Sequence, residues 1–512
     1  MASRIGFPFL LVSALIASRA PAEQPMSAID WLSQSVTTPV AAPLPPEPPV
    51  SLGVLPSEVT TSVIGSPTPD AAGVLPTSVT GLPASLWGLG RTDEIAAALA
   101  IDRSDALPAL KGLLLVLLLA EADPPADSGG QGQMLLARVD KLLAMGALEQ
   151  ANALLDAAGA ADRPDFFRRA FDVALLTGNE DLACVHMRST PELAPTFPAR
   201  IFCLARSGDW NAAALTMRTG VALGRITPAD EVLLSRFLDT DPSEDEAALP
   251  PPNPVTPLEW RMLEAIGEIL PTTNLPLAFS HAELRDTAGW KAQIEAAERL
   301  SRAGVLEPNM LLGLYTARTA AASGGVWDRV TTFKRFDDAM TRHDGAAIAT
   351  TLPRVWDKMV EAELEVPFAQ LFGAELIKLP LTGDAAALAL RVALLSQAYE
   401  QAAIQHGPGT DALEIFLLGI ARGDVGGLTP PDSLARAIAV AFTAPDIGAD
   451  LATLLEAKRL GEAVLGAVDR VGSGVQGDLR GVTEGLSLLR RVGLEDVARR
   501  TALELLLLER RG

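Results

Sequence analysis

The chain of 512 residues predicts an all-α protein, and three features of its sequence favour that class. Apolar residues make up 48% of the chain but aromatic residues only 5%, so a core must be built mainly from Ala, Leu and Val. Such a composition favours close-packed helices over sheets. From residue 91 onward, apolar residues recur at helical spacing, glycines and prolines separate the runs, and no stretch alternates with period two. We therefore expect an α-α superhelix of short helices.

Composition and charge exclude several classes of partner and cofactor. Lys and Arg number 42 against 63 Asp and Glu, which gives a formal net charge of −21. Nucleic acids and anionic membrane surfaces attract clustered basic residues, so we expect neither as a partner. Four His and two Cys are too few for a multi-cysteine metal framework, and we expect no cofactor.

The first 22 residues have the three parts of a secretory signal. Arg4 supplies a positive start, residues 5–17 are uncharged and mostly apolar, and Ala20-Pro21-Ala22 forms a small-residue cleavage site. We expect cleavage between Ala22 and Glu23 and export to a bacterial periplasm or, alternatively, to the extracellular medium. An uncleaved helix in the membrane interface is the other interpretation of this segment. The apolar run of residues 113–120 is too short to span a bilayer and indicates a buried helix, so we expect no membrane span.

Residues 23–90 differ in composition from everything after them. Eleven prolines lie between residues 39 and 83, and proline at that density blocks helix and sheet hydrogen bonding, so we expect a disordered arm. Residues 53–60 (GVLPSEVT) recur as residues 73–80 (GVLPTSVT). Such apolar islands suit docking on the sheet edge of a partner, or alternatively they lie on the folded body of this chain. The candidate docking residues are Val54, Leu55, Val59, Val74, Leu75 and Val79.

Four short segments share a turn pattern, G-x-x-x-x-A, with an apolar helical run on either side. They are residues 146–151, 178–183, 208–213 and 493–498. Gly ends a helix in a backbone conformation that other residues resist, and the small Ala lets the next helix pack closely. The pattern resembles the turn within the tetratricopeptide repeat (TPR), whose first-helix pattern and strict 34-residue period are absent here. The resemblance implies a TPR-like solenoid of helical hairpins.

The helical part of the chain is interrupted once. Residues 241–257 combine an acidic run with clustered prolines, and they predict a linker between a TPR-like region, residues 91–240, and a second helical-repeat region, residues 258–512. In the second region, the pairs Glu295/Arg299 and Glu298/Arg302 lie four residues apart on one helix face. We expect that face to be solvated.

No constellation for catalysis or metal binding stands out in the sequence. Residues 472–477 (GSGVQG) fit G-x-G-x-x-G, but a dinucleotide site needs a preceding strand, so we assign a loop between helices. No histidine has a second ligand at helical spacing, and His186 is expected in the core. The four histidines are His186, His281, His343 and His406. We therefore predict no catalytic, cofactor-binding or metal-binding residues.

The only two cysteines, Cys184 and Cys203, are disulfide candidates. The helix that holds Cys184 should end near Ser189 and the next should begin near Pro198, so antiparallel packing would place the two residues opposite each other. An oxidising compartment would then favour the bond. Two buried free thiols are the alternative.

These observations favour an exported, non-catalytic helical-repeat scaffold or adaptor that binds protein partners in the cell envelope. The alternative is a wall-active enzyme similar to the soluble lytic transglycosylases, which carry a catalytic Glu on a helical superhelix. Residues 316–321 (TARTAA) are similar to the Thr-Ala-Ala units of antifreeze glycopeptides, a label given to some Ala-rich secreted bacterial chains. Ice binding needs a regular threonine array that is absent here, so we interpret the segment as a helix end.

Overall fold

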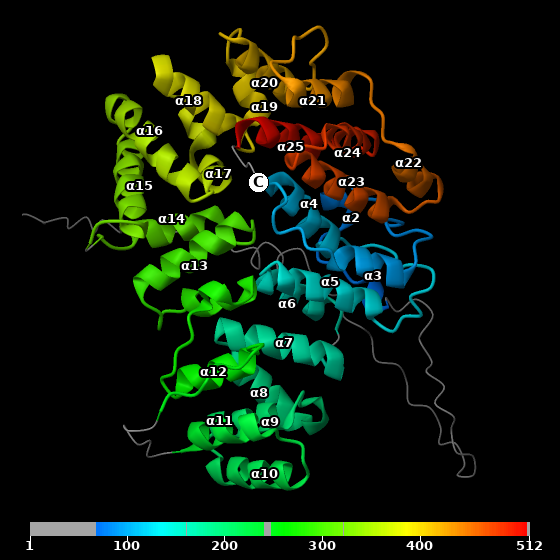
Figure 1. Cartoon of the computed structure of the whole chain (residues 1–512), viewed down its shortest axis with the longest axis vertical. Coiled ribbons are helices and arrows are strands. Elements are labelled where there is room, and N and C mark those ends of the chain that lie inside the picture. The colour runs from blue at the N-terminus through cyan, green and yellow to red at the C-terminus, as the bar shows by residue number, and fades with distance from the viewer. Residues whose placement is uncertain (1–67, 160, 240–246, 321, 509–512) are drawn as a thin grey trace, which may run out of the picture.

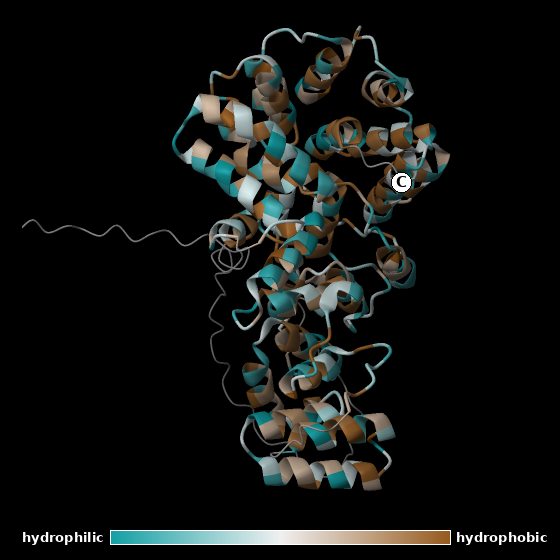
Figure 2. Cartoon of the chain, turned by 60° about the vertical axis from the view of Figure 1, so that its left-hand side comes forward, coloured by the Kyte–Doolittle hydropathy of each residue, from teal (hydrophilic) through white to brown (hydrophobic). Residues whose placement is uncertain are grey.

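The chain is all-helical, as predicted. A computed structural model describes residues 68–159, 161–239, 247–320 and 322–508, and these residues form α-helices and short 3₁₀ helices without a β-strand. Most helices carry both hydrophilic and hydrophobic residues around their circumference, which is typical of helices that bury one face (Figure 2). Among the described residues, no helix has the length and apolar composition needed to cross a bilayer.

The described chain begins with short helices that lie beside its C-terminal helices (Figure 1). The buried apolar run predicted at residues 113–120 falls mostly in α4, whose leucines are largely buried. The elements of this part are η1 (Pro69–Ala71), α2 (Thr77–Thr80), α3 (Thr92–Ala100), α4 (Pro108–Leu119), α5 (Gln133–Ala144) and α6 (Leu148–Ala157).

The next helices form the lower end of the molecule in Figure 1. Residues 247–256, in the predicted linker, contain no helix, whereas the helices on either side of it, α11 and α12, pack together. The elements are α7 (Pro164–Thr177), α8 (Glu180–Ser189), η2 (Pro191–Leu193), α9 (Phe197–Arg206), α10 (Trp210–Ala222), α11 (Pro228–Leu238) and α12 (Pro257–Ala265).

The remaining helices build the upper part of the molecule and return to the N-terminal ones (Figure 1). The first of them are η3 (Thr272–Asn274), η4 (Leu277–Leu284), α13 (Trp290–Arg302), α14 (Pro308–Thr316), α15 (Val326–Thr341), α16 (Gly345–Glu361), α17 (Glu365–Leu376) and α18 (Gly383–Leu394). The last are α19 (Tyr399–Gln405), α20 (Ala412–Arg422), α21 (Ser433–Thr443), α22 (Ala449–Glu456), α23 (Leu460–Val475), α24 (Leu479–Arg491) and α25 (Glu495–Leu507).

The four G-x-x-x-x-A segments are turns between packed helices. Their glycines, Gly146, Gly178, Gly208 and Gly493, all have φ between 76° and 89°, the left-handed region that favours glycine. The pairs α5–α6, α7–α8, α9–α10 and α24–α25 that flank them are in contact. Three of the four alanines are completely buried, namely Ala151, Ala213 and Ala498. The local reasoning about these turns is therefore confirmed.

The buried core groups the helices differently from the predicted regions 91–240 and 258–512. One cluster joins residues between 74 and 166 to residues between 294 and 508, and a second holds residues between 167 and 263. Polar contacts join the same distant segments: Arg103 Nε donates to Asp469 Oδ1 at 2.6 Å, and the Ala109 amide donates to Glu504 Oε2 at 2.9 Å. The C-terminal helices thus pack on the N-terminal ones, which a stack of purely local hairpins would not require.

The expectation of a disordered arm over residues 23–90 is wrong for residues 68–90, which are folded. Leu86 and Trp87 are buried in the main cluster, and the Gly461 amide at the start of α23 donates to Leu86 O at 2.8 Å. The buried Arg138 guanidinium donates to Ala72 O at 2.6 Å, and burial lowers its pKa to about 10. Proline density alone did not predict that this segment is folded, because the apolar residues between its prolines are buried in the core.

Of the glycines in residues 472–477, Gly474 serves helix packing, whereas Gly477 lies in the turn after α23 with φ of 110°. Gly472 and Gly474 belong to α23, so the predicted helix–helix loop is largely the last turn of a helix. A Cβ on Gly474 would lie 2.1 Å from Val482 Cγ2, and one on Gly485 would lie 2.7 Å from Ala467 O. These glycines let α23 and α24 approach more closely than side chains would allow.

The charged face predicted to be solvated on α13 is partly buried instead. Glu298 is 3% exposed, accepts hydrogen bonds from Tyr315 Oη at 2.7 Å and Arg329 Nη2 at 2.6 Å, and has no ion pair with Arg302. Arg299 pairs with Glu283 at 3.1 Å rather than with Glu295. Spacing of four residues identified charges on a shared face, but the following helices cover that face.

Candidate functional site

A groove of about 590 Å³ lies where two of the G-x-x-x-x-A turns meet the segment beyond the linker. Glu180 is the first residue of α8, two residues after Gly178, and Trp210 is the first residue of α10, two residues after Gly208. Arg206 ends α9, and residues of α12 close the opposite side. The turns therefore place polar and aromatic side chains at one site.

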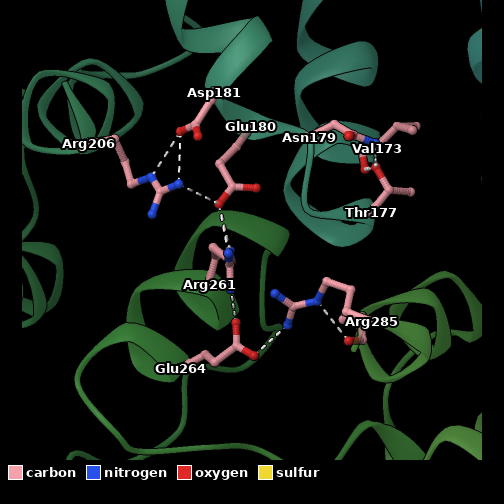
Figure 3. Close-up of polar contacts among 10 residues, drawn as sticks. Val173, Thr177, Asn179, Glu180, Asp181, Arg206, Arg261, Glu264 and Arg285 are labelled. Atoms are coloured by element: carbon pink, nitrogen blue, oxygen red, sulfur yellow. Dashed lines mark hydrogen bonds and ion pairs between the residues drawn. The ribbon is translucent and has the colours of Figure 1, made fainter. Parts of the chain in front are cut away.

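A chain of alternating charges crosses this groove (Figure 3). Glu180, which is 1% exposed, accepts from Arg261 Nη2 at 2.7 Å and lies 3.5 Å from Arg206 Nη2. Arg261 also pairs with Glu264, and Glu264 in turn pairs with Arg285. Burial lowers the pKa of Arg261, but the two carboxylates more than offset that effect and leave it raised. Arg261 is therefore held in its charged form.

The network leaves several hydrogen-bonding atoms without a partner. Glu180 Oε2 is buried and has no partner among the described residues. Arg206 donates from Nε and Nη2 to Asp181, and its Nη2 also pairs with Glu180. Arg285 donates from Nε to Ala282 O and from Nη2 to Glu264. Neither Nη1 atom has a hydrogen bond within the described residues. The groove can therefore accept a ligand that supplies both acceptors and a donor.

Apolar side chains complete the groove and its surroundings. Trp210 is 46% exposed, and Phe202 and Phe237, whose ring centroids are 5.5 Å apart, form part of the wall. Exposed large apolar side chains also concentrate on the lower helices: Leu182, Val185, Trp210, Leu215, Leu223, Val232 and Ile269. Exposed apolar residues gathered in one lobe favour contact with another protein.

The predicted disulfide is present, and it joins two helices that contribute residues to the groove. Cys184 and Cys203 are bonded, with their Cα atoms 5.0 Å apart, and α8 ends at Ser189 and α9 begins at Phe197 as expected. Cys184 lies one helical turn after Glu180, and Cys203 lies three residues before Arg206. The bond thus ties together the two helices that present these groups to the groove.

The other sequence-predicted residues lie away from the groove. Val54, Leu55, Val59, Ala22 and Glu23 fall outside the described residues. Val74 and Leu75 are buried in the core, where both amides donate to Leu119 O, so this copy of the repeat lies on its own chain. Val79 is 55% exposed.

None of the four histidines lines the groove. His281 is buried and its Nε2 lies 2.7 Å from Gly146 O, whereas His186 is partly exposed instead of lying in the core. Within the described residues, no three His, Cys, Asp or Glu side chains are grouped as metal ligands.

Sequence reasoning named no residue of this groove. It placed turns before Glu180 and Trp210 but gave those side chains no role. It also missed Arg261, Glu264 and Arg285. These three lie more than 50 residues from Arg206 along the chain, so no periodic pattern links them to the turns. Spacing could identify only Arg261 and Glu264, three residues apart on α12, as a local pair.

Comparison with known proteins provides no identification. No protein-family model, curated protein or solved structure matches the chain.

Proposed function

We propose that the chain is an exported, TPR-like helical-repeat adaptor of the bacterial cell envelope, and that the groove beside Trp210 binds a segment of a partner protein. The observation that carries this proposal is the combination of an exposed indole ring with unpartnered guanidinium and carboxylate atoms. An aromatic surface takes an apolar side chain, and guanidinium groups bind carboxylates. The partner segment would therefore carry an acidic group next to an apolar side chain.

The geometry of this groove is less suited to the alternative function, that of a wall-active enzyme. A general acid must present a proton to its substrate. In this groove, Glu180 Oε1 and both oxygens of Glu264 accept hydrogen bonds from guanidinium groups instead. These contacts suit binding and orientation rather than proton transfer.

Peptide selection tests the groove directly. Peptides from a random display library, selected on the wild-type protein, should be rich in acidic and apolar residues. Trp210→Ala and Arg206→Glu should each weaken the selected peptides by about tenfold or more, because few residues carry most of the energy of an interface.

Two substitutions at exposed positions outside the groove serve as matched controls. Ile404→Ala and Arg391→Glu should bind the same peptides as the wild type does. Far-UV circular dichroism confirms that each variant is folded. Failure to select any peptide, or equal binding by the groove variants and their controls, would reject the proposed function.

Export is supported by the disulfide, because such bonds persist in oxidising compartments. The periplasm is the proposed location, with the extracellular medium as the alternative. The intact mass of the exported protein should show the loss of residues 1–22, leaving Glu23 as the first residue. A full-length, membrane-associated species would contradict this prediction.

A further inference from the structure

A second cavity, of about 440 Å³, is lined by residues of α4, α5 and α13. In Figure 1 these helices lie above α8, α9 and α10, which contribute residues to the groove. Its lining includes five basic residues, Arg103, Lys111, Lys141, Arg299 and Arg302, against two acidic ones, Asp102 and Glu363. A chain with a net charge of −21 therefore concentrates positive charge in one cavity.

Two of these basic residues already have acidic partners. Arg103 pairs with Asp469 at 2.6 Å, and Arg299 pairs with Glu283 at 3.1 Å. Lys111 is also engaged, since its Nζ lies 3.3 Å from Arg302 O. These three residues are explained by the fold.

Lys141 and Arg302 also donate to backbone carbonyls, but within the described residues neither has an ion pair or a hydrogen bond to another side chain. Lys141 is 7% exposed and its Nζ donates to Ile101 O, at 2.5 Å. Arg302 Nη1 donates to Ala362 O at 3.1 Å. Asp102 and Asp469 are near enough to stabilise the Lys141 ammonium, but neither forms an ion pair with it, and burial together with the nearby Arg103 outweighs them and lowers the pKa of Lys141.

Apolar side chains form another part of the cavity wall, and the hydroxyl of a nearby serine lacks a hydrogen-bond partner. Leu114, Met145 and Leu277 line the same cavity. An adjoining cavity of about 200 Å³ shares Arg302 and is lined by Ser301, which is 3% exposed and whose hydroxyl has no hydrogen-bond partner. A ligand that satisfied the charges would therefore also contact apolar surface.

We propose that this cavity binds a small organic acid, with its anionic head at Lys141 and Arg302 and its apolar body against Leu114, Met145 and Leu277. The volume suits a ligand larger than an inorganic anion. A charged head would receive charge-assisted hydrogen bonds from the ammonium and the guanidinium. Because the cavity joins α4 and α5 to α13, occupancy would link the N-terminal helices to the middle of the chain.

Calorimetric titration of the full chain tests the proposal with defined probes. Phenyl phosphate and phenylacetate share an anionic head and an apolar ring, and their comparison distinguishes a phosphate from a carboxylate head. At least one should bind with a Kd of about 1 mM or tighter. Inorganic phosphate and benzyl alcohol, which each lack one half of the ligand, should bind more weakly.

Lys141→Met keeps the length of the side chain and removes its charge. It should weaken the bound probe by about 10- to 100-fold while leaving the melting temperature without ligand unchanged or higher. Arg302→Gln is a second variant with the same expected loss of binding. Lys378→Met is the matched control, because Lys378 lies on the surface and pairs with Glu375. Absence of binding by both probes, or equal affinity of the Lys141 and Lys378 variants, would overturn the proposal.

Discussion

Trp87→Ala should lower the free energy of unfolding by about 3 to 5 kcal/mol, the usual cost of truncating a large buried aromatic side chain. Trp87 is 2% exposed and packs against the start of α23, where a Cβ on Gly461 would lie 2.5 Å from the indole ring. The space it leaves could not be filled by a flexible neighbour. Denaturant unfolding followed by circular dichroism measures the change.

Trp210→Ala is the matched control for this substitution. Trp210 is 46% exposed, and removing it should change the free energy of unfolding by less than about 0.5 kcal/mol.

Two truncated chains test the same segment. A chain that begins at residue 91 should lose at least as much free energy of unfolding as Trp87→Ala does, whereas a chain that begins at residue 68 should be as stable as the full chain. Equal stability of the Trp87 and Trp210 variants would show that residues 68–90 do not belong to the core.

Replacing both cysteines by Ala should lower the stability of the lower helices by about 3 kcal/mol, because the bond closes a loop of 19 residues in the unfolded chain. Peptide binding should weaken as well, since the bond holds α8 and α9 in register beside the groove. Unfolding of the wild type in reductant should approach that of the variant. The single substitution Cys184→Ala should match the double variant, because either change breaks the bond.

This prediction has two clear ways to fail. Alkylation of two thiols in the native exported protein would show that the bond does not form. A melting temperature that reductant leaves unchanged would show that the bond contributes nothing to stability.

Local chemistry explains what the sequence could predict. Gly178 and Gly208 adopt left-handed φ values that few other residues tolerate, so a turn could be placed at each. The disulfide followed from the connection between α8 and α9, because Cys184 and Cys203 lie at similar distances from it on antiparallel helices. These inferences depend on residues within one hairpin.

Features that depend on distant segments could not be predicted in this way. The ion pair between Arg103 and Asp469 joins residues more than 360 positions apart, and no periodic pattern in the sequence indicates it. Leu86 and Trp87 lie among prolines and glycines, so their burial depends on surface that α23 supplies. Helical spacing predicts that Glu298 is a surface charge, but Tyr315 of α14 and Arg329 of α15 contact it and bury it.

The groove itself could not be predicted, for the same reason. The turns placed Glu180 and Trp210 at helix starts, but Arg261 and Arg285 reach them from beyond the linker. The function of the site depends on that meeting of segments, and only the folded chain brings them together.

Site-specific photocrosslinking in cells shows whether the groove beside Trp210 holds a partner protein. A photoreactive phenylalanine analogue in place of Thr287, which lines the groove and is exposed, should crosslink to a protein of the cell envelope in the cells that produce this chain. The same analogue in place of Thr350, an exposed residue of α16, is the control and should give no such product. A product is expected from position 287 alone, and a groove-binding peptide should remove it by competition. No product at position 287, or the same product from both positions, would contradict this expectation.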